Sequence, residues 1–414
     1  MFLRHPRPII NGELFTTESG AKSMRKKLIA GGAFAVALAL TTGGTATAQQ
    51  FSAAPSATGG PTVKNACAQV RAAGHMSCFA QVRTDIKQAR RAPGAAPSGY
   101  GPAELQAAYQ LKADGGAGQT IAVTESGDYP SLKADLAAYR KQFGLPAGDV
   151  QIVNEDGQES PLPTADPDWA VETALDVDMI AATAPNAKIL VVEANQATTD
   201  DLGKAVDTAV KLGAKFVSNS WGGDESEGSA GDAHFKHPGV AITASSGDSG
   251  YGASWPASSP YAVGVGGTTL KSSGGSYTET AWKGAGSGCS SYAAKPAFQT
   301  DATGCDKKAI ADVSAVADPA TGVAVYDTFQ QSGWQVVGGT SASSPIIASV
   351  YADAGTPGAQ DWPAQYPWSH TDQLTDVTSG SNGSCGTKQW CNAGTGWDGP
   401  TGLGTPKGTA AFTK

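Results

Sequence analysis

Apolar and polar residues alternate along the chain in two distinct patterns from about residue 100 onward. Short, continuous apolar runs predict buried strands at 121–125, 188–193, 215–218 and 239–245. Longer segments with apolar residues at helical spacing predict helices at 131–143, 169–183, 198–212 and 342–354. Strands that alternate with helices indicate an α/β fold, with a mostly parallel central sheet and helices on both faces. Ligands of such sheets bind at the carboxyl ends of the strands, so residues that follow a strand are the first candidates for function.

The first hundred residues lack this alternation of strand and helix patterns and differ in composition. Basic residues at 25–27, an apolar run at 28–40 and the small residues at 46–48 predict a signal peptide over 24–48, and therefore a secreted, extracellular protein. The apolar run is shorter than the ~20 residues that span a bilayer, so we expect no membrane association after signal cleavage. We interpret residues 1–23 as an upstream extension and 49–98 as a short pro-segment or linker. Arg90-Arg91 is a candidate processing point, although a solvated charged turn explains this basic pair equally well.

Composition narrows the class of protein. Of the 414 residues, 53 are Gly and 24 are Pro, only 16% are charged and 40% are hydrophobic, which is typical of a folded extracellular enzyme with many tight loops. The formal net charge of −8 argues against nucleic acid as a partner, because phosphate binding needs a basic face. Six cysteines fit an oxidising compartment. The simplest of the many connectivities they allow pairs them locally, as Cys67 with Cys78, Cys289 with Cys305 and Cys385 with Cys391.

Ser341 is the first candidate for catalysis. It follows Gly-Gly-Thr and begins an Ala-rich apolar helix, where free backbone N–H groups and the positive end of the helix dipole lie beside it. The preceding glycines allow a substrate backbone to approach closely. Pro345 is expected to lie in the first helical turn, which needs no N–H donor. On these local features alone, an ordinary serine N-cap explains Ser341 as well as a nucleophile does.

A serine nucleophile needs a base, and histidine is the usual one. His5 and His75 precede the predicted catalytic domain, and none of the other three histidines lies at a His-Gly helix start, which a histidine-based site would require. We therefore expect structural or surface roles for His234, His237 and His370.

Carboxylates provide a different answer. Glu172 and Asp176 are four residues apart on a predicted helix, so they project from one face. In a partly buried cleft such a pair can share and relay a proton, although a solvated face is the default explanation of this spacing alone. Asp178 points away from them and is interpreted as structural. Asp248, in Ser-Gly-Asp-Ser-Gly after a strand, can donate a hydrogen bond to an oxyanion when protonated, whereas turn aspartates more commonly cap their own backbone.

Taken in chain order, these motifs resemble those of the sedolisin (serine-carboxyl peptidase) family: Glu172-x-x-x-Asp176, Ser218-Asn-Ser-Trp-Gly222, Ser246-Gly-Asp248-Ser-Gly250 and Gly339-Thr-Ser341. The resemblance covers 99–414, the predicted catalytic domain, and implies a subtilisin-like fold with a Ser-Glu-Asp triad. It implies that Ser341 is the nucleophile, Glu172 the general base and acid, and Asp176 the residue that orients Glu172. Asp248 would then be the oxyanion donor, together with the backbone N–H of Ser341.

The same resemblance implies roles for residues around the triad. Glu125 matches a glutamate that extends the carboxylate chain behind Asp176, and Trp221 matches an aromatic residue beside it. The resemblance implies substrate pairing along a strand edge that contains Ser218, Ser220 and Gly222. It also implies a Ca²⁺ site near the C-terminus, with Asp376 and Asp398 as side-chain ligands and Val377, Gly394 and Gly396 as carbonyl ligands. Hard oxygen ligands of these kinds suit Ca²⁺.

The function that follows is hydrolysis of proteins or peptides by a secreted, monomeric endopeptidase through an acyl-enzyme. Acidic pH is expected, because the ordinary pKa of a glutamate base is about 4.3 and Asp248 must stay protonated to donate. A tripeptidyl exopeptidase of the same family and a catalytically silent secreted binding protein on this scaffold remain alternatives. Members of the family usually carry a long folded pro-domain that is removed by self-cleavage, and residues 49–98 are too few for one, so the maturation step stays open.

Overall fold

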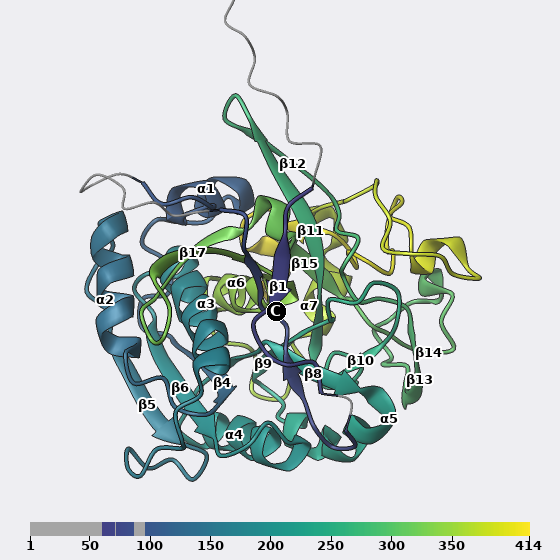
Figure 1. The fold of residues 1–414 in the computed structure, drawn as a ribbon. Helices are drawn as coiled ribbons and strands as arrows, with labels where there is room; N and C mark the ends of the chain where they lie inside the picture. Colours follow the sequence, from purple (N-terminus) through teal and green to yellow (C-terminus); the bar gives the residue numbers. More distant parts are fainter. Residues whose placement is uncertain (1–59, 71, 87–95) are drawn as a thin grey trace, which may run out of the picture. The chain divides into compact units, whose positions relative to one another are not determined.

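A central sheet of eight strands organises the described residues, which are 60–70, 72–86 and 96–414 of a computed structural model (Figure 1). Its strands are β4 (Thr120–Ser126), β5 (Val150–Asn154), β6 (Lys188–Ala194), β7 (Phe216–Asn219), β9 (Ala241–Ser245), β11 (Val263–Ser273), β12 (Ser276–Ala281) and β15 (Val313–Val316). Hydrogen bonding orders them β12-β11-β9-β7-β4-β6-β5, with β15 also paired to β11. Within this sheet β12 pairs antiparallel with β11 and the other pairs are parallel, which confirms the predicted α/β class.

Helices flank the sheet and bring the candidate residues to it. They are α1 (Pro102–Tyr109), α2 (Leu132–Phe143), α3 (Pro167–Thr183), α4 (Thr199–Lys211), α5 (Glu225–Gly228), α6 (Thr340–Ala354) and α7 (Gln365–Ser369). Helix α3 begins where the Asp166 side chain accepts hydrogen bonds from the backbone N–H groups of Asp168 and Trp169. From Trp169 to its end every residue of α3 is buried, and the helix packs against both α6 and β4. A helix that is apolar nearly all round belongs in a core, and here it carries carboxylates into that core.

Two smaller sheets join the N-terminal part of the described chain to the region after residue 99. They contain β1 (Val63–Asn65), β2 (Ser77–Cys78), β3 (Gln81–Arg83), β8 (Trp221–Asp224), β10 (Ser254–Trp255), β16 (Val323–Asp327) and β17 (Gly333–Gly338). Their orders are β1-β3-β17-β16 and β10-β8-β2. Figure 1 shows this N-terminal segment, in purple, running across the middle of the fold. The predicted pro-segment or linker at 49–98 therefore contributes strands that pair with β8 and β17.

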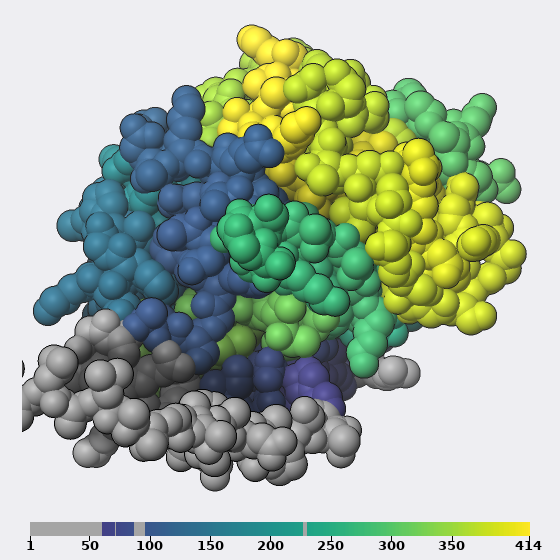
Figure 2. Space-filling model, turned by 90° about the horizontal axis from the view of Figure 1, so that it is seen from above, coloured from purple at the N-terminus to yellow at the C-terminus, as the bar shows by residue number. Residues whose placement is uncertain are grey.

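The remaining elements belong to loops and to the C-terminal part of the chain. They are β13 (Cys289–Ala294), β14 (Lys307–Ala309), β18 (Leu374–Thr375), β19 (Thr405–Pro406) and the 3-10 turns at Ser229–Phe235, Asp301–Thr303, Pro319–Thr321, Thr371–Gln373, Lys388–Trp390 and Ala410–Phe412. In the space-filling view of Figure 2, the C-terminal part of the chain, in yellow, forms a large part of the visible face. It is joined to the β11–β12 hairpin by the Thr405 hydroxyl, which donates to Glu279 Oε2 at 2.6 Å.

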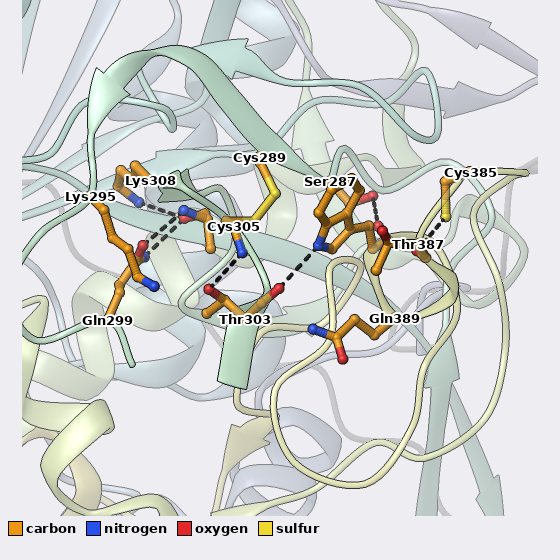
Figure 3. The surroundings of a disulfide bond; sticks show 12 residues. Ser287, Cys289, Lys295, Gln299, Thr303, Cys305, Lys308, Cys385, Thr387 and Gln389 are labelled. Atoms are coloured by element: carbon orange, nitrogen blue, oxygen red, sulfur yellow. Dashed lines mark hydrogen bonds between the residues drawn. A yellow bond between two sulfur atoms is a disulfide. The ribbon is translucent and has the colours of Figure 1, made fainter. Parts of the chain in front are cut away.

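The six cysteines form three local disulfides, Cys67–Cys78, Cys289–Cys305 and Cys385–Cys391, which confirms the simplest predicted pairing. The loops closed by the second and third disulfides lie side by side, as Figure 3 shows around Thr303 and Gln389. The carbonyl of Thr303 accepts a hydrogen bond from Trp390 Nε1 at 3.0 Å, and Gln389 Nε2 donates to the carbonyl of Ala302 at 2.8 Å.

Some predictions fall on parts of the chain that the structure does not describe. The upstream extension at 1–23, the signal peptide at 24–48 and the Arg90-Arg91 pair lie outside the described residues and stay predictions. Among the residues that are described, we find no helix with the length and apolar character needed to cross a bilayer.

Candidate active site

Helix α6 begins at the junction with β17 and presents Ser341 at its first turn. The helix is preceded by Gly339, whose φ of 101° lies in the left-handed region that glycine adopts most readily. Gly339 occupies the N-cap position, so Ser341 lies inside the helix and is not an N-cap serine. The Ser341 side chain is fully buried, and its Oγ donates to the backbone carbonyl of Ser220 at 3.1 Å.

Pro345 departs from the sequence prediction in a way that matters for the site. It lies beyond the first turn of α6, where an ordinary residue would donate its N–H to the carbonyl of Ser341. Because proline has no N–H, that carbonyl is left available. The Ser220 hydroxyl lies 3.3 Å from it, although its one proton is closer to Asp176.

Glu172 projects from α3 toward Ser341. Its Oε2 accepts a hydrogen bond from the backbone N–H of Ala80 at 2.7 Å, and its Oε1 has no hydrogen-bond partner among the described residues. Burial and then the charge of Asp176 raise the pKa of Glu172 well above its ordinary value, while the Ser341 hydroxyl and the Ala80 N–H oppose this rise. The carboxyl group is therefore suited to hold or release a proton beside the serine.

Asp176 and Glu125 extend this carboxyl network into the core. Both oxygens of Asp176 lie within hydrogen-bond distance of the Ser220 hydroxyl, at 2.8 and 2.9 Å. Burial raises the pKa of Glu125 well above its usual range, and the charges of Asp176 and Glu172 raise it further. Burial also raises the pKa of Asp176, while the hydrogen bond from Ser220 lowers it. Neither oxygen of Glu125 has a hydrogen-bond partner among the described residues, so Glu125 acts on Asp176 through charge, and two buried carboxyl groups this close disfavour a second negative charge.

Asp248 lies in the turn after β9 and contacts Thr340, the residue before Ser341. Its Oδ1 accepts two hydrogen bonds of 2.8 Å, one from the Thr340 backbone N–H and one from the Thr340 hydroxyl. Its Oδ2 is buried and has no hydrogen-bond partner within the described part of the chain. Burial raises the pKa of Asp248 to about 7, against the lowering effect of Thr340. Below that pH the free oxygen carries a proton that it can donate.

The N-terminal segment crosses this cleft between the carboxyl groups. Phe79 N donates to the carbonyl of Ser220 at 3.2 Å, which is the same carbonyl that accepts the Ser341 hydroxyl. On one side of this point, β2 pairs antiparallel with β8; on the other, β3 pairs antiparallel with β17. The strand edge that was expected to pair with substrate thus includes β8, and β8 is paired with β2 in this structure.

The structure separates the residues that were expected along the substrate edge. Gly222 lies in β8 and pairs with Ser77, and Ser220 lies just before that strand. Ser218 does not reach the edge: it lies in β7 of the central sheet, and its buried hydroxyl is 2.9 Å from that of Ser344. Trp221 donates through Nε1 to the carbonyl and hydroxyl oxygens of Thr124, so it contacts the network through a neighbour of Glu125.

The residues expected to be structural have partners outside the cleft. Asp178 is buried, and its Oδ2 accepts a hydrogen bond from the Tyr326 backbone N–H at 2.9 Å. His234 and His237 both contact Asp207, at 2.6 and 2.7 Å, and His370 contacts the carbonyl of Tyr366. These hydrogen bonds explain Asp178 and the three histidines as structural residues, with no need for a catalytic role.

Two parts of the site were missed by sequence reasoning. Ser220 was assigned to substrate pairing, but its hydroxyl donates to Asp176 and lies 3.3 Å from the carbonyl of Ser341 in α6. Thr340 had no assigned role, although it fixes Asp248 through two hydrogen bonds. Its position directly before Ser341 in the motif was the available signal.

The predicted Ca²⁺ ligands come together in one C-terminal loop region. Asp376 Oδ2 accepts a hydrogen bond from Gly396 N at 2.9 Å, and Asp398 Oδ2 accepts one from Gly394 N at 3.0 Å. Burial, with the nearby charge of Asp376 as a smaller contribution, raises the pKa of Asp398 to about 7. In the described chain no donor is bonded to the carbonyl of Val377, Gly394 or Gly396. Two neighbouring carboxylates and free carbonyls fit a calcium ion, although no group of three or more acidic, His or Cys side chains suited to a metal occurs among the described residues.

Comparison with known proteins places these features in a recognised structural class, the subtilisin-like fold. Residues 152–389 match the model of the subtilase family, more than half of the chain. Kumamolisin from Bacillus sp. (strain MN-32) is 34% identical over 77% of this chain and 64% of its own, and sedolisin from Pseudomonas sp. (strain 101) is 31% identical over 74% and 60%. The solved structure of Pseudomonas sedolisin, a serine-carboxyl proteinase in complex with pseudo-iodotyrostatin, is 28% identical with a TM-score of 0.65, over 76% of this chain and 96% of its own.

These findings identify the family. The chain belongs to the subtilase family and, within it, to the sedolisins, which confirms both the resemblance and the subtilisin-like fold. The chain spans about 60 to 64% of the length of the two curated relatives.

Proposed function

We propose that this protein is a secreted, monomeric serine-carboxyl endopeptidase that hydrolyses peptide bonds of proteins or peptides at acidic pH. One observation carries the proposal: Glu172 Oε2 accepts the N–H of an extended backbone at 2.7 Å, and Glu172 is buried beside the Ser341 hydroxyl. A carboxyl group in that position can take the proton of the serine and later give a proton to the amine that leaves.

The steps follow from the positions of the side chains. Ser341 Oγ attacks the substrate carbonyl carbon while Glu172 accepts its proton, and Asp176 with Glu125 adjusts the proton affinity of Glu172. Asp248, when protonated, donates from Oδ2 to the oxygen that becomes negatively charged. Glu172 then protonates the leaving nitrogen, and water hydrolyses the acyl-enzyme with the same residue as base. Burial raises the pKa of Asp248 to about 7, which supports activity on the acidic side of neutrality.

An endopeptidase is favoured over the tripeptidyl alternative by the length of backbone that the cleft accepts. Upstream of Phe79 the bound segment continues past the third residue, because Met76 N donates to the carbonyl of Ala197 at 2.8 Å and His75 forms a bridge with Thr198. A site that cuts off tripeptides has to be closed at that point. Mass spectra of the products from an unfolded protein substrate distinguish the two: internal fragments are expected, and a ladder of tripeptides contradicts the proposal.

Secretion is supported by three disulfides, and calcium binding by the donor set around Asp376 and Asp398. When bound, Ca²⁺ would neutralise these two carboxylates and stabilise the C-terminal loops, with no part in the reaction. The carbonyls of Val377, Gly394 and Gly396 would complete its ligands.

The deciding experiment is a pH–rate profile on a mixed peptide library for the wild type, Ser341→Ala and Glu172→Gln. We expect hydrolysis by the wild type with an acidic optimum and a loss of at least ~100-fold in both variants. An optimum above pH 7, or activity that survives Ser341→Ala, contradicts the proposal. A catalytically silent binding protein would hydrolyse nothing and would form no Ser341 adduct with a peptide aldehyde.

A further inference from the structure

The backbone from Ser77 to Arg83 lies in the candidate active site in the manner of a substrate. Upstream of Phe79 it pairs antiparallel with β8, as Ser77 with Gly222 and Cys78 with Trp221. Downstream it pairs antiparallel with β17, as Gln81 with Gly338 and Val82 with Val337. An extended chain held on both sides of a nucleophile by added strands is the usual arrangement of a bound peptide.

The peptide bond between Phe79 and Ala80 lies at the centre of this arrangement. On its carbonyl side, Phe79 O and Asp248 Oδ2 both approach Gly339, at 1.9 and 2.6 Å from the position a Cβ would occupy there. Only glycine allows the two oxygens to come so close to the start of α6. On its amide side, Ala80 N donates to Glu172 Oε2 at 2.7 Å. The two ends of one peptide bond thus face the proposed oxyanion donor and the proposed general acid.

The Phe79 side chain occupies a pocket in the wall of the cleft. Its ring contacts Gly222, where an added Cβ would lie 2.9 Å from Phe79 Cε2, and passes within 3.8 Å of the corresponding position at Gly247. A cavity of about 560 Å³ borders the ring and continues along Asp248 and Tyr251. The absence of side chains at Gly222 and Gly247 makes room for an aromatic residue before the reacting bond.

We propose that the Phe79–Ala80 bond is this protein's own processing site and that β2 and β3, with the residues between them, block the cleft until the bond is cut, an inference that rests on the proposed peptidase function. Ser341 Oγ attacks the Phe79 carbonyl carbon, and Glu172 takes the hydroxyl proton. The C–N bond then breaks, the proton passes to Ala80 N, and Phe79 remains as an ester on Ser341. Water hydrolyses this ester to a Phe79 carboxylate and restores the serine.

Further contacts explain why the segment acts as an inhibitor before and shortly after the cut. The Cys67–Cys78 disulfide fixes the residue next to Phe79, and β1 pairs with β3 on the other side of the bond, as Lys64 with Val82. The piece that ends at Phe79 is therefore held in the cleft without being covalently joined, because each disulfide has both its cysteines on one side of the bond. Peptide hydrolysis should begin only as that piece dissociates.

The test follows the full secreted chain after a shift from pH 8 to pH 4. N-terminal sequencing and intact mass are expected to show a new terminus at Ala80, at a first-order rate that does not change over a tenfold range of protein concentration, since the bond lies in its own cleft. Hydrolysis of a reporter peptide should rise at least tenfold with a lag that matches the cut. Ser341→Ala should stay intact, and its unchanged melting temperature will show that it is folded.

Matched variants locate the bond. Ala80→Pro should remain uncut at this position because the bond is no longer a secondary amide, whereas Ala80→Gly should be cut. The double variant Arg90→Ala, Arg91→Ala should still produce the Ala80 terminus, which separates this site from the basic pair. A wild type that hydrolyses peptides while its Phe79–Ala80 bond stays intact overturns the inference and leaves the proposed function standing. A wild type that does neither overturns the proposed function itself, and a cut Ser341→Ala chain indicates another protease and overturns the inference.

Discussion

Replacing Asp248 with Asn exchanges one carboxyl oxygen for an NH₂ group, and each half of the new amide has a defined neighbour. Oδ1 accepts hydrogen bonds from the backbone and hydroxyl of Thr340, and the amide oxygen can accept the same two. Oδ2 has no partner among the described residues and lies beside Gly339 together with Phe79 O. An N–H at that position donates at every pH. We therefore expect Asp248→Asn to keep the oxyanion donor and to lose its pH dependence.

The magnitude follows from the proton that the carboxyl holds. Burial raises the pKa of Asp248 to about 7, so the protonated fraction, and with it kcat, should fall about tenfold for each pH unit above that value. In Asp248→Asn this decline should disappear, while the rate at acidic pH falls by less than about tenfold. Asp248→Ala removes the donor altogether, which typically costs ~100- to 1000-fold in kcat, or about 3–4 kcal/mol of transition-state stabilisation.

The assay is kcat and KM on one peptide substrate from pH 3 to pH 9 for the wild type and both variants, with melting curves at each pH. Ser249→Ala serves as the control, because Ser249 is an exposed neighbour in the same turn. The reasoning is refuted if the decline above pH 7 is identical in Asp248→Asn and the wild type, or if Asp248→Ala keeps more than a tenth of the wild-type kcat.

Three other predictions can be measured directly. Glu172→Gln should lower kcat at least ~100-fold, whereas Asp178→Asn, which alters another buried carboxyl of the same helix, should leave it within about threefold by the same assay. Burial raises the pKa of Glu193 to about 8 and that of Asp248 to about 7, so these two groups bind more protons in the folded chain than in the unfolded chain. Their contribution to the free energy of unfolding should therefore be fully present below about pH 4 and be lost as the pH rises through 7 to 8, which calorimetry can measure. Exhaustive chelation of calcium should lower the melting temperature by a few degrees, an effect that Asp376→Asn abolishes; an unchanged melting curve of the wild type contradicts the calcium site.

The central part of the fold was predictable because its periodicity is local. The apolar run at 121–125 became β4, and the helices expected at 131–143 and 169–183 became α2 and α3 with ends shifted by only one or two residues. The strands β11, β16 and β17 were not predicted, although β11 with β12 and β16 with β17 form local hairpins. The strand β3 was not predicted either, because it pairs with β17 across more than half of the chain. No local pattern in an Ala- and Gly-rich segment indicates such a partner.

The candidate site was predictable where residue type and spacing decide the chemistry. The four-residue spacing of Glu172 and Asp176 places both on the side of α3 that faces the cleft, as a helical period requires. Ser218 could not be separated from Ser220 by sequence, because the chain leaves the central sheet between them and only the tertiary structure fixes that point. The effect of Pro345 could not be predicted from the sequence either. Its missing N–H leaves the Ser341 carbonyl free, and only the tertiary structure shows that the Ser220 hydroxyl lies near that carbonyl.

Self-cleavage and hydrolysis of external peptides should require the same protons, because one set of side chains would serve both reactions. The Phe79 carbonyl lies beside Asp248 Oδ2 as a substrate carbonyl would, and Ala80 N contacts the oxygen of Glu172 that would protonate a leaving amine. We therefore expect the rate at which the Ala80 terminus appears to decline above pH 7 in parallel with kcat, and both declines to vanish in Asp248→Asn. Processing that continues at pH 9, where added peptides are no longer hydrolysed, would mean that the internal bond is cut without this donor. An enzyme in which both reactions require protonated Asp248 keeps its Phe79–Ala80 bond intact above neutral pH. It cuts that bond, and so opens its cleft to other substrates, when it reaches an acidic medium.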